Sequence, residues 1–317
     1  MFSIMNYLQG LKERFQRNKG LWFTTITTIS ILGIIITMYI IMSMTSNVSE
    51  KVYQSMSREY TTRINNFLDN KKIEFKKVAI VFFQDKAFLQ QVELNQEQNL
   101  IVSQKSLNDM FIKNGITNYE VSVYSVINQK TILRSSIVSV VKSKNSVYGI
   151  EVMEDGVFNV YLQPLIKDDT VYGVLEIKES IHNYRKYFEG INDEYVFLLD
   201  KKMLSKISID SKNGKYRDMI NDYTVAQMFY DTKFTASIPE IEKEDFKQML
   251  QENYIIDGIY YRTFKIISDI NGADIGMIMI GELIDKEDGF VNLADNMTKT
   301  VTTVALGLVI SIMLFMF

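Results

Sequence analysis

The chain has 317 residues, a formal net charge of −3, no cysteine and a single histidine. Its length accommodates two domains of ordinary size, and its mild acidity gives no reason to expect nucleic acid as a partner. The lack of cysteine excludes thiol catalysis, disulfide scaffolds and zinc sites built from cysteine and histidine.

Residues 21–44 form an uncharged apolar stretch that is long enough to cross a bilayer, and they are predicted to be the first transmembrane helix. No small-residue cleavage site follows this stretch cleanly, so a retained anchor is favoured over a cleaved signal peptide. The basic residues ahead of it place residues 1–20 in the cytoplasm by the positive-inside rule. These basic residues are Lys12, Arg14, Arg17 and Lys19.

Residues 45–115 are predicted to form a long helix that emerges from the membrane, with a break near Gln84. An apolar stripe runs along it, in which Tyr53, Tyr60 and Phe67 are seven residues apart. Near the membrane this stripe either packs on its own domain or forms a seam between two copies of the chain. The second half of the stripe is expected to pack on its own domain.

Residues 116–190 are predicted to be a membrane-distal module. The stretch Tyr119–Ser136 has alternating polarity, which indicates two strands around a turn at Asn128–Lys130. A linker that holds Gly149 leads into a longer hairpin, Glu154–Ile177, and a short helix follows. The module is therefore expected to hold at least four strands.

Residues 191–297 are predicted to be a membrane-proximal module with the same order of elements. It opens with a hairpin at Asp193–Ser208 that turns at Asp200–Lys202, continues through a mixed, partly helical segment, and closes with the hairpin Ile256–Ile280. The fold class is α+β, with two small antiparallel sheets in tandem.

The closing hairpins of the two modules resemble each other closely enough to indicate a duplication. Asp155-Gly156 aligns with Asp257-Gly258, and Gly173 aligns with Gly276 when one extra residue is allowed at the second turn. A fixed order of strand, turn and strand that occurs twice is the signature of a repeated module.

Val301 to Phe317 is again free of charge, and residues 299–317 are predicted to be a second transmembrane helix. Two spans and a cytoplasmic N-terminus place residues 46–297 outside the plasma (inner) membrane. A two-pass protein normally carries lysine or arginine after its second span, and none follows here. The 317 residues are therefore expected to be the sensing part of a longer protein.

The sequence resembles the double Cache sensor domains of bacterial chemoreceptors, sensor histidine kinases and membrane-bound diguanylate cyclases. The resemblance rests on the anchor with its long helix and on the segments "GIEVMEDGVFNVYLQPLIKDDTVYGVLEIKESI", "DEYVFLLDKKML" and "YIIDGIYYRTFKIISDINGADIGMIMIGE". It covers residues 46–286, nearly the whole outside region. It implies two stacked PAS-like modules, a small-molecule pocket in the distal one, and a homodimer that signals through its long helices.

Candidate binding residues come from alternation along Val157–Gln163. One face of this strand is apolar and is expected to pack on the long helix, which leaves Asn159 and Tyr161 facing a pocket. The alternative is that these polar side chains lie on a solvated face of the sheet.

Three further residues are expected to join this pocket. Tyr124 lies on the first hairpin and Arg134 is predicted on its return strand, where a guanidinium can hold a ligand carboxylate through two hydrogen bonds. Glu176 interrupts an apolar strand and can meet an ammonium group. The ligand is therefore expected to bear a carboxylate or an amine.

The proximal module offers a weaker set in a similar strand, namely Tyr260, Arg262 and Lys265. No metal site, cofactor or catalytic set is predicted, because Gly-rich phosphate loops and nucleophile elbows are absent from the sequence. The aspartates Asp168-Asp169 suit a turn, and His182 is expected to be a packing residue.

These observations favour a receptor over an enzyme. In this hypothesis a small molecule binds outside and a shift between two arrangements crosses the membrane. The resemblance alone favours a chemotaxis receptor over a histidine kinase or a diguanylate cyclase. A membrane-anchored accessory protein that uses the same fold to bind a partner is the alternative from another class.

Overall fold

The computed structural model describes residues 19–94, 97–113, 118–126, 134–230, 232–286 and 289–316. The cytoplasmic segment predicted at residues 1–20 lies almost entirely outside these ranges, as does the turn predicted at Asn128–Lys130. The chain divides into two compact units, one of Met1–Tyr53 with Glu287–Phe317 and the other of Gln54–Lys286.

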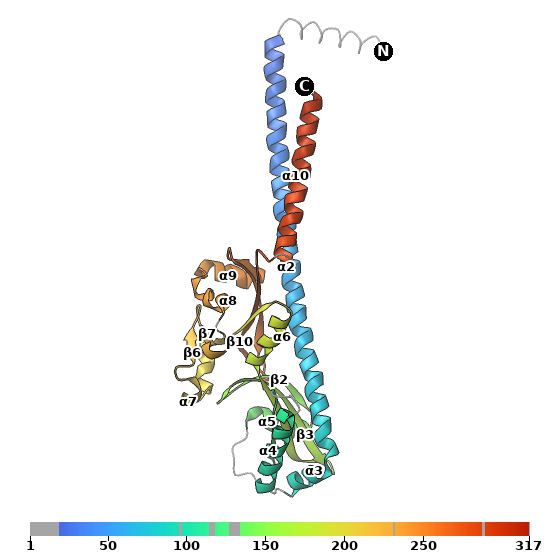
Figure 1. Ribbon diagram of the computed structural model, residues 1–317, viewed down its shortest axis with the longest axis vertical. Coiled ribbons are helices and arrows are strands. Elements are labelled where there is room, and N and C mark those ends of the chain that lie inside the picture. The colour runs from blue at the N-terminus through green and yellow to red at the C-terminus, as the bar shows by residue number, and fades with distance from the viewer. Residues whose placement is uncertain are drawn as a thin grey trace. The chain divides into compact units, whose positions relative to one another are not determined.

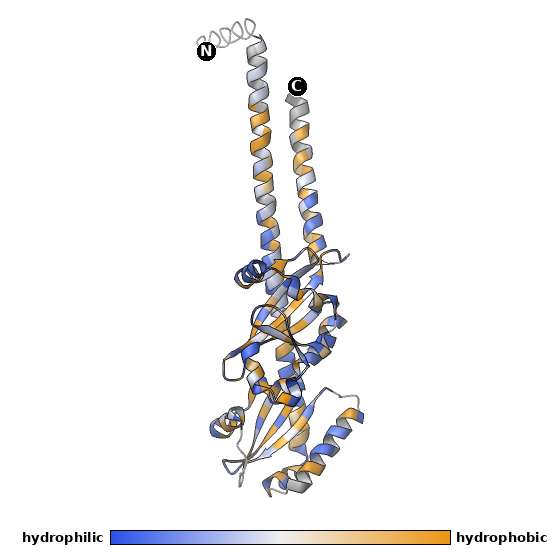
Figure 2. Ribbon diagram, turned by 90° about the vertical axis from the view of Figure 1, so that its left-hand side faces the viewer, coloured by the Kyte–Doolittle hydropathy of each residue, from blue (hydrophilic) through white to orange (hydrophobic). Residues whose placement is uncertain are grey.

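The first unit contains the start of helix α2 (Lys19–Gln84) and all of helix α10 (Phe290–Met316). The two helices touch where the hydroxyls of Ser49 and Thr298 lie 3.2 Å apart. Within the described ranges, α2 alone is long and apolar enough to cross a membrane, and its N-terminal part carries the apolar colours in Figure 2. The second transmembrane helix is not confirmed and stays a prediction.

In the second unit, α2 buries the predicted apolar stripe against its own chain. Met56, Tyr60, Ile64 and Phe67 are each at most 6% exposed, and the Tyr60 ring stacks on Tyr261 of the proximal module at 6.1 Å. Of the two alternatives for this half of the stripe, packing on its own domain is the one observed. A homodimer through the long helix stays a prediction. α2 ends at Gln84, at the predicted break.

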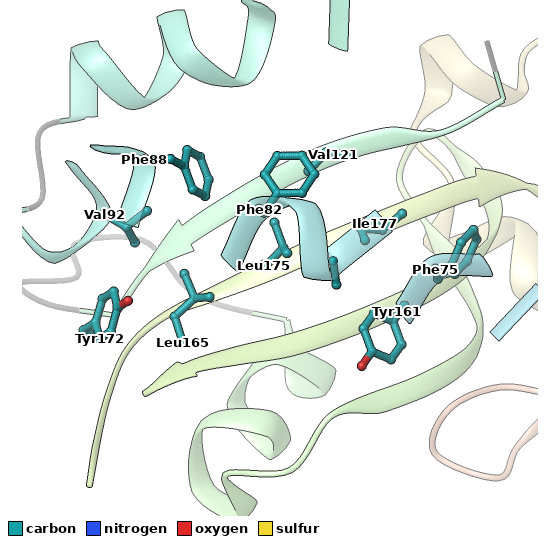
Figure 3. Close-up of a cluster of buried hydrophobic side chains, with 11 residues drawn as sticks. Phe75, Phe82, Phe88, Val92, Val121, Tyr161, Leu165, Tyr172, Leu175 and Ile177 are labelled. Atoms are coloured by element: carbon teal, nitrogen blue, oxygen red, sulfur yellow. The ribbon is translucent and has the colours of Figure 1, made fainter. Parts of the chain in front are cut away.

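The next part of α2 packs on the distal sheet. Its residues Phe75, Ala79 and Phe82 belong to a buried cluster that also takes Leu175 and Ile177 from one face of that sheet (Figure 3). Helices α3 (Lys86–Glu93) and α4 (Glu97–Lys113) follow, and Phe88 and Val92 of α3 complete the cluster.

Among the described residues, the distal sheet has four antiparallel strands in the order β1-β4-β3-β2. Their bounds are β1 Glu120–Ser125, β2 Val147–Met153, β3 Gly156–Lys167 and β4 Thr170–Ser180. The prediction of a linker around Gly149 is thus wrong, because Gly149 lies in strand β2. The long hairpin β3–β4 is confirmed, and its turn residues Asp168 and Asp169 have φ of 47° and 62°.

Residues 131–133 of the predicted return strand before Ser136 lie outside the described residues. Its last residues, Ser135 and Ser136, belong to helix α5 (Ser135–Ser143) and not to a strand. The valines and isoleucine of α5 favour a strand by local propensity. However, Ile137 and Val140 are spaced for one helix face, and both are buried against β3 and β4. The tertiary contact overrides the local preference.

The proximal sheet has six strands among the described residues, in the order β6-β7-β5-β10-β9-β8. Their bounds are β5 Glu194–Asp200, β6 Tyr216–Asp218, β7 Tyr223–Ala226, β8 Tyr254–Ile256, β9 Tyr260–Ser268 and β10 Asp274–Leu283. The short helices are α6 Arg185–Gly190, α7 Ile209–Lys212, α8 Lys233–Ala236 and α9 Lys243–Glu252. The 3₁₀ turns are η1 Ile181–Tyr184, η2 Lys201–Lys206, η3 Gln227–Phe229 and η4 Ile238–Glu240.

The hairpin predicted at Asp193–Ser208 is wrong in its second half. After β5 the chain enters η2, because the carboxylate of Asp200 accepts a hydrogen bond from the backbone N–H of Lys202 and starts the turn. Strand β5 pairs instead with β10 and β7, which lie far along the sequence.

The duplicated hairpins β3–β4 and β9–β10 have a shared structural cause for their matching glycines. A Cβ atom on Gly173 would lie 3.2 Å from the carbonyl oxygen of Tyr124 in β1. On Gly276 it would lie 2.2 Å from the carbonyl oxygen of Leu198 in β5. Each glycine lets the first strand of its module approach the last one closely.

Figure 1 shows the resulting arrangement, in which α2 runs along both antiparallel sheets of the second unit. The two sheets meet where the backbone N–H of Ile270 donates to the carbonyl oxygen of Ile150 at 3.0 Å. The predicted fold class is confirmed: it is α+β, with two antiparallel sheets in tandem on a long N-terminal helix.

Candidate ligand-binding site

Arg134 lies at the N-terminus of α5, and it is not part of a strand. Its backbone is extended, with φ −58° and ψ 149°, so the side chain leaves the helix end over the distal sheet. The position differs from the prediction, but it brings Arg134 to the strands that carry Tyr124 and Glu176.

Five side chains meet there, and we call them the Arg134 cluster: Tyr124, Arg134, Ser136, Glu151 and Glu176. One guanidinium nitrogen of Arg134 donates to Glu151 at 3.1 Å, and the other donates to Glu176. The hydroxyl of Tyr124 donates to the second oxygen of Glu176 at 3.0 Å. The hydroxyl of Ser136 donates to both oxygens of Glu151, at 2.9 and 3.1 Å.

The cluster sits in an apolar surrounding. Glu176 lies opposite Leu162 in the β3–β4 pairing, and Glu151 lies opposite Phe158 in the β2–β3 pairing. Opposite residues of paired strands point to the same face of a sheet, and this face carries the buried cluster around Val160. The polar side chains are therefore enclosed by apolar ones.

Solvent reaches the cluster through Arg134. Its side chain is 27% exposed, whereas those of Glu151 and Glu176 are 10% and 2% exposed. Two carboxylates face one guanidinium, which gives the cluster one more negative than positive group. The site is thus open at one side and has an excess of acceptors.

Burial and ion pairing act in opposite directions on these groups. Burial raises the pKa of Glu151, and the positive charge of Arg134 only partly opposes this increase. For Arg134 burial disfavours the charged form, but Glu176 and Glu151 outweigh it, so the pKa of the guanidinium is raised. Burial, followed by the charge of Glu176, also raises the pKa of Tyr124.

Asn159 and Tyr161 do not join the cluster, so the predicted assignment of the two sheet faces is inverted. Tyr161 packs in the cluster that α2 covers, and its hydroxyl donates to Gln163 at 2.7 Å. Alternation predicted which residues share a face, but it did not predict which face meets α2. Helix α5 covers the apolar face that was assigned to α2.

Sequence reasoning missed Glu151 and Ser136. Glu151 interrupts the apolar strand "VYGIEVM" in the same way as Glu176 interrupts "VYGVLEI". This signal was available for Glu151, but the stretch was interpreted as a linker. No sequence pattern indicates Ser136, because its hydroxyl reaches Glu151 only when the chain turns into helix α5.

In the proximal module, Arg262 is enclosed and its hydrogen bonds are internal. It is 0% exposed, it donates to Asp257 at 2.5 Å, to the carbonyl oxygen of Phe234 at 3.2 Å and to Ser237 at 2.6 Å. Its guanidinium also lies 4.8 Å from the ring centroid of Tyr260. Of the three residues predicted for the proximal module, Arg262 and Tyr260 therefore lie in contact, whereas Lys265 is not among these contacts of Arg262.

His182 is a buried packing residue. Its Nδ1 lies 2.8 Å from the hydroxyl of Tyr230, and its ring stacks on Phe229 at 4.3 Å. Burial lowers the pKa of His182 to about 3. Over the described ranges, no group of three or more His, Cys, Asp or Glu side chains is placed to hold a metal ion.

No protein-family model and no curated protein matches the chain. Among solved structures, it is similar to the ligand-binding domain of Mlp24 with asparagine, at 10% identity over 82% of this chain and 99% of that one, with a TM-score of 0.35. The sensor domain of the V. cholerae histidine kinase DctB is 7% identical over 73% and 98%, with a TM-score of 0.35.

A third similar structure is the ligand-binding domain of the Campylobacter jejuni chemoreceptor Tlp3 in complex with L-valine. It is 13% identical over 75% of this chain and 97% of that one, with a TM-score of 0.31. With TM-scores below 0.5, these likenesses establish neither a family nor a ligand for this chain.

Proposed function

We propose that this chain is the sensor region of a transmembrane receptor, and that a small extracytoplasmic molecule binds at the Arg134 cluster. The observation that carries the proposal is the pair of buried carboxylates, Glu151 and Glu176, held by one partly exposed arginine on the face of the distal sheet away from α2. A cluster of this kind in an apolar surrounding is costly to bury unless every group is paired.

The chemistry of the cluster favours a ligand with an ammonium group. Two carboxylates and one guanidinium leave an acceptor excess that an ammonium group fills. When the ammonium replaces Arg134 beside Glu176, the freed guanidinium can take a carboxylate of the same ligand through two parallel hydrogen bonds. A zwitterionic molecule therefore fits both halves of the cluster.

The route of the signal follows from strand β4. Glu176 of β4 belongs to the cluster, and Glu179 of the same strand pairs with Lys71 of α2 at 3.1 Å. A ligand that draws Arg134 away from Glu176 changes the forces on β4, and α2 is the element that can pass this change towards the membrane. Such a switch requires that the ligand bind the two arrangements with different affinity.

For the output, we propose a chemotaxis receptor, and we keep a histidine kinase or a diguanylate cyclase as the alternative. The resemblance of the sequence to double Cache sensors supports this choice. The same resemblance supports a two-pass protein of the plasma membrane, with the sensor outside and the N-terminus inside. We assign no catalytic activity to the region.

A thermal-shift screen of the full chain in lipid nanodiscs tests the proposal. Amino acids, amines and organic acids are added singly, and at least one ammonium-bearing compound is expected to raise the melting temperature. Arg134→Ala should abolish that rise, whereas Arg217→Ala, at an exposed arginine of β6, should keep it. If none of the compounds raises the melting temperature, the alternative of a membrane-anchored accessory protein is favoured. If Arg134→Ala keeps the rise in melting temperature, the ligand does not bind at the Arg134 cluster.

A further inference from the structure

Strand β1 forms one edge of the distal sheet as far as the structure describes it, with β4 as its neighbour. Along an antiparallel strand, the N–H and C=O of one residue point to the neighbouring strand, and those of the next residue point away from it. An edge strand therefore presents a row of backbone donors and acceptors with which another extended chain can pair.

The sequence of β1 suits such pairing. It reads "EVSVYS", in which two valines and a tyrosine favour extended structure and no proline or glycine interrupts the strand. Its single charged residue, Glu120, stands at the start. Proteins protect an edge of this kind with lysine, proline, a bulge or a covering segment. The pairing of β1 with β4 runs without a bulge, so protection has to come from a covering segment.

Helix α4 covers this edge with two amide side chains. Nδ2 of Asn108 donates to the carbonyl oxygen of Val121 at 3.2 Å, and its Oδ1 accepts from the backbone N–H of Val121 at 3.1 Å. Nε2 of Gln104 donates to the carbonyl oxygen of Val123 at 3.3 Å. These are the hydrogen bonds that a neighbouring strand would make. We call Gln104 and Asn108 the edge cap.

The spacing of the edge cap fits the strand. Four residues of a helix rise by about 6 Å, and two residues of a strand span about 7 Å. Gln104 and Asn108 therefore fall beside Val123 and Val121, the residues whose backbone groups point away from β4. Both amides are half-buried, whereas Lys105 next to Gln104 is exposed. The helix thus takes the place of a strand at this edge.

The opposite edge of the sheet, strand β2, is covered in another way. The carbonyl oxygen of Ile150 accepts a hydrogen bond from the backbone N–H of Ile270, in the turn between β9 and β10, at 3.0 Å. A Cβ atom on Gly149 would lie 3.0 Å from Cγ1 of Ile270, so the proximal module lies close against β2. At β1, by contrast, helix α4 has to keep other chains away.

We propose that the edge cap prevents β1 from pairing with β1 of a second copy of this chain. Two copies of one strand can pair antiparallel about a twofold axis. With Val121 opposite Val123 of the second copy, Glu120 lies opposite Tyr124, so like charges are not brought together. A second copy must first break the three hydrogen bonds of the edge cap. This association is separate from the predicted dimer through the long helix, and it does not depend on the Arg134 cluster.

Sedimentation velocity of the detergent-solubilised full chain tests the proposal. Asn108→Leu keeps the shape of the side chain and removes its donor and acceptor. As the protein concentration rises, the mass of this variant should reach at least about twice that of the wild type, because each free edge takes up a second copy. Ser106→Leu, at an exposed position of the same helix, is the matched control and should keep the wild-type mass.

Adding Val123→Pro to Asn108→Leu locates the association. The N–H of Val123 points away from β4, so proline there spares the pairing within the sheet and removes a donor that a second copy needs. The carbonyl oxygen of Val123 remains available to Gln104. The double variant should therefore return to the wild-type mass.

Amide hydrogen exchange gives a second readout. In dilute Asn108→Leu, the amide of Val121 should exchange at least about tenfold faster than in the wild type, because its acceptor is lost. It should regain protection as the protein concentration rises and a second copy pairs. The amide of Ser122 points to β4 and serves as the internal reference.

Circular dichroism verifies that each variant is folded. If Asn108→Leu fails to fold, Gln104→Met removes one bond of the edge cap and decides the outcome in the same measurements. If the double variant fails to fold, the exchange of the Val121 amide decides. A folded Asn108→Leu that keeps the wild-type mass at every concentration would overturn the proposal. So would an increase in mass that Val123→Pro leaves in place, or a Val121 amide that stays unprotected as the mass rises.

Discussion

Glu176 and Glu179 lie three residues apart on β4 and point to opposite faces of the distal sheet. Glu176 accepts hydrogen bonds from Arg134 and Tyr124, whereas Glu179 is paired with Lys71 of α2. Both side chains are almost fully buried, at 2% and 1% exposure. One strand, β4, therefore joins the proposed ligand site to helix α2.

Arg134→Met should destabilise the fold, because it leaves Glu151 and Glu176 buried together without their cation. The expected loss is about 3 kcal/mol in the free energy of unfolding, the usual range for breaking a buried ion pair. Urea titration of the full chain measures it, with Arg217→Met as the exposed control.

Adding Glu176→Gln to Arg134→Met should recover part of that loss, because it removes one of the two unpaired charges. If the single variant unfolds like the wild type, the Arg134 cluster is more solvated than its burial indicates, and the argument for an ammonium-binding site fails.

The stability of the fold should depend on pH through Glu179. Burial raises its pKa from an ordinary 4.5 to about 7, against the opposing charge of Lys71. Between these two values the folded protein holds a proton that the unfolded chain has released, so stability falls as pH rises from about 4.5 to about 7. The slope from this group is at most about 1.4 kcal/mol per pH unit.

Glu179→Gln should remove this contribution, and the two proteins should differ in slope only in that pH window. Urea titrations at a series of pH values give the comparison, with Glu154→Gln as the exposed control. Parallel curves for the wild type and Glu179→Gln would mean that Lys71 holds the carboxylate ionised throughout.

His182 should stay neutral over the whole physiological range, because burial lowers its pKa to about 3. It is the only histidine in the chain, so selective ¹³C labelling of histidine gives a single ring signal. The chemical shift of that signal should stay constant from pH 8 to about pH 5. A titration with a midpoint near 6.5 would show that the ring is open to solvent.

Gly276→Ala should destabilise the proximal module, because its Cβ would lie 2.2 Å from the carbonyl oxygen of Leu198 and 3.1 Å from Cα of Leu199. The backbone of β5 must then move, at an expected cost of about 2 kcal/mol or more. Gly190→Ala has no atom within 4 Å of its new Cβ and should change stability by less than about 0.5 kcal/mol. Equal melting temperatures of the two variants would contradict the close strand approach.

The repeat of the closing hairpins could be predicted because it has a local cause. Gly173 and Gly276 are needed where neighbouring strands approach, and Asp168-Asp169 takes the left-handed backbone of a tight turn. Such requirements act on single residues, so they are visible in one sequence.

Long-range partners could not be predicted in the same way. Whether Tyr161 or Val160 meets α2 depends on which helix covers which face. Helix α5 lies mostly in the stretch that is predicted to be a linker. Arg134 was assigned to the wrong element, yet it joined Tyr124 and Glu176 as expected. Its pairing with Glu151 depends on strand β2, which the sequence analysis predicts to be a linker.

The most direct test of the central claim is isothermal titration of the best ammonium-bearing compound from the screen into the wild type and into Glu176→Gln. The variant keeps the size of the side chain and removes the charge that the ligand is proposed to meet. We predict at least about hundredfold weaker binding to Glu176→Gln, as for the loss of a buried charged hydrogen bond. Equal affinity of the two proteins would show that the ligand binds elsewhere.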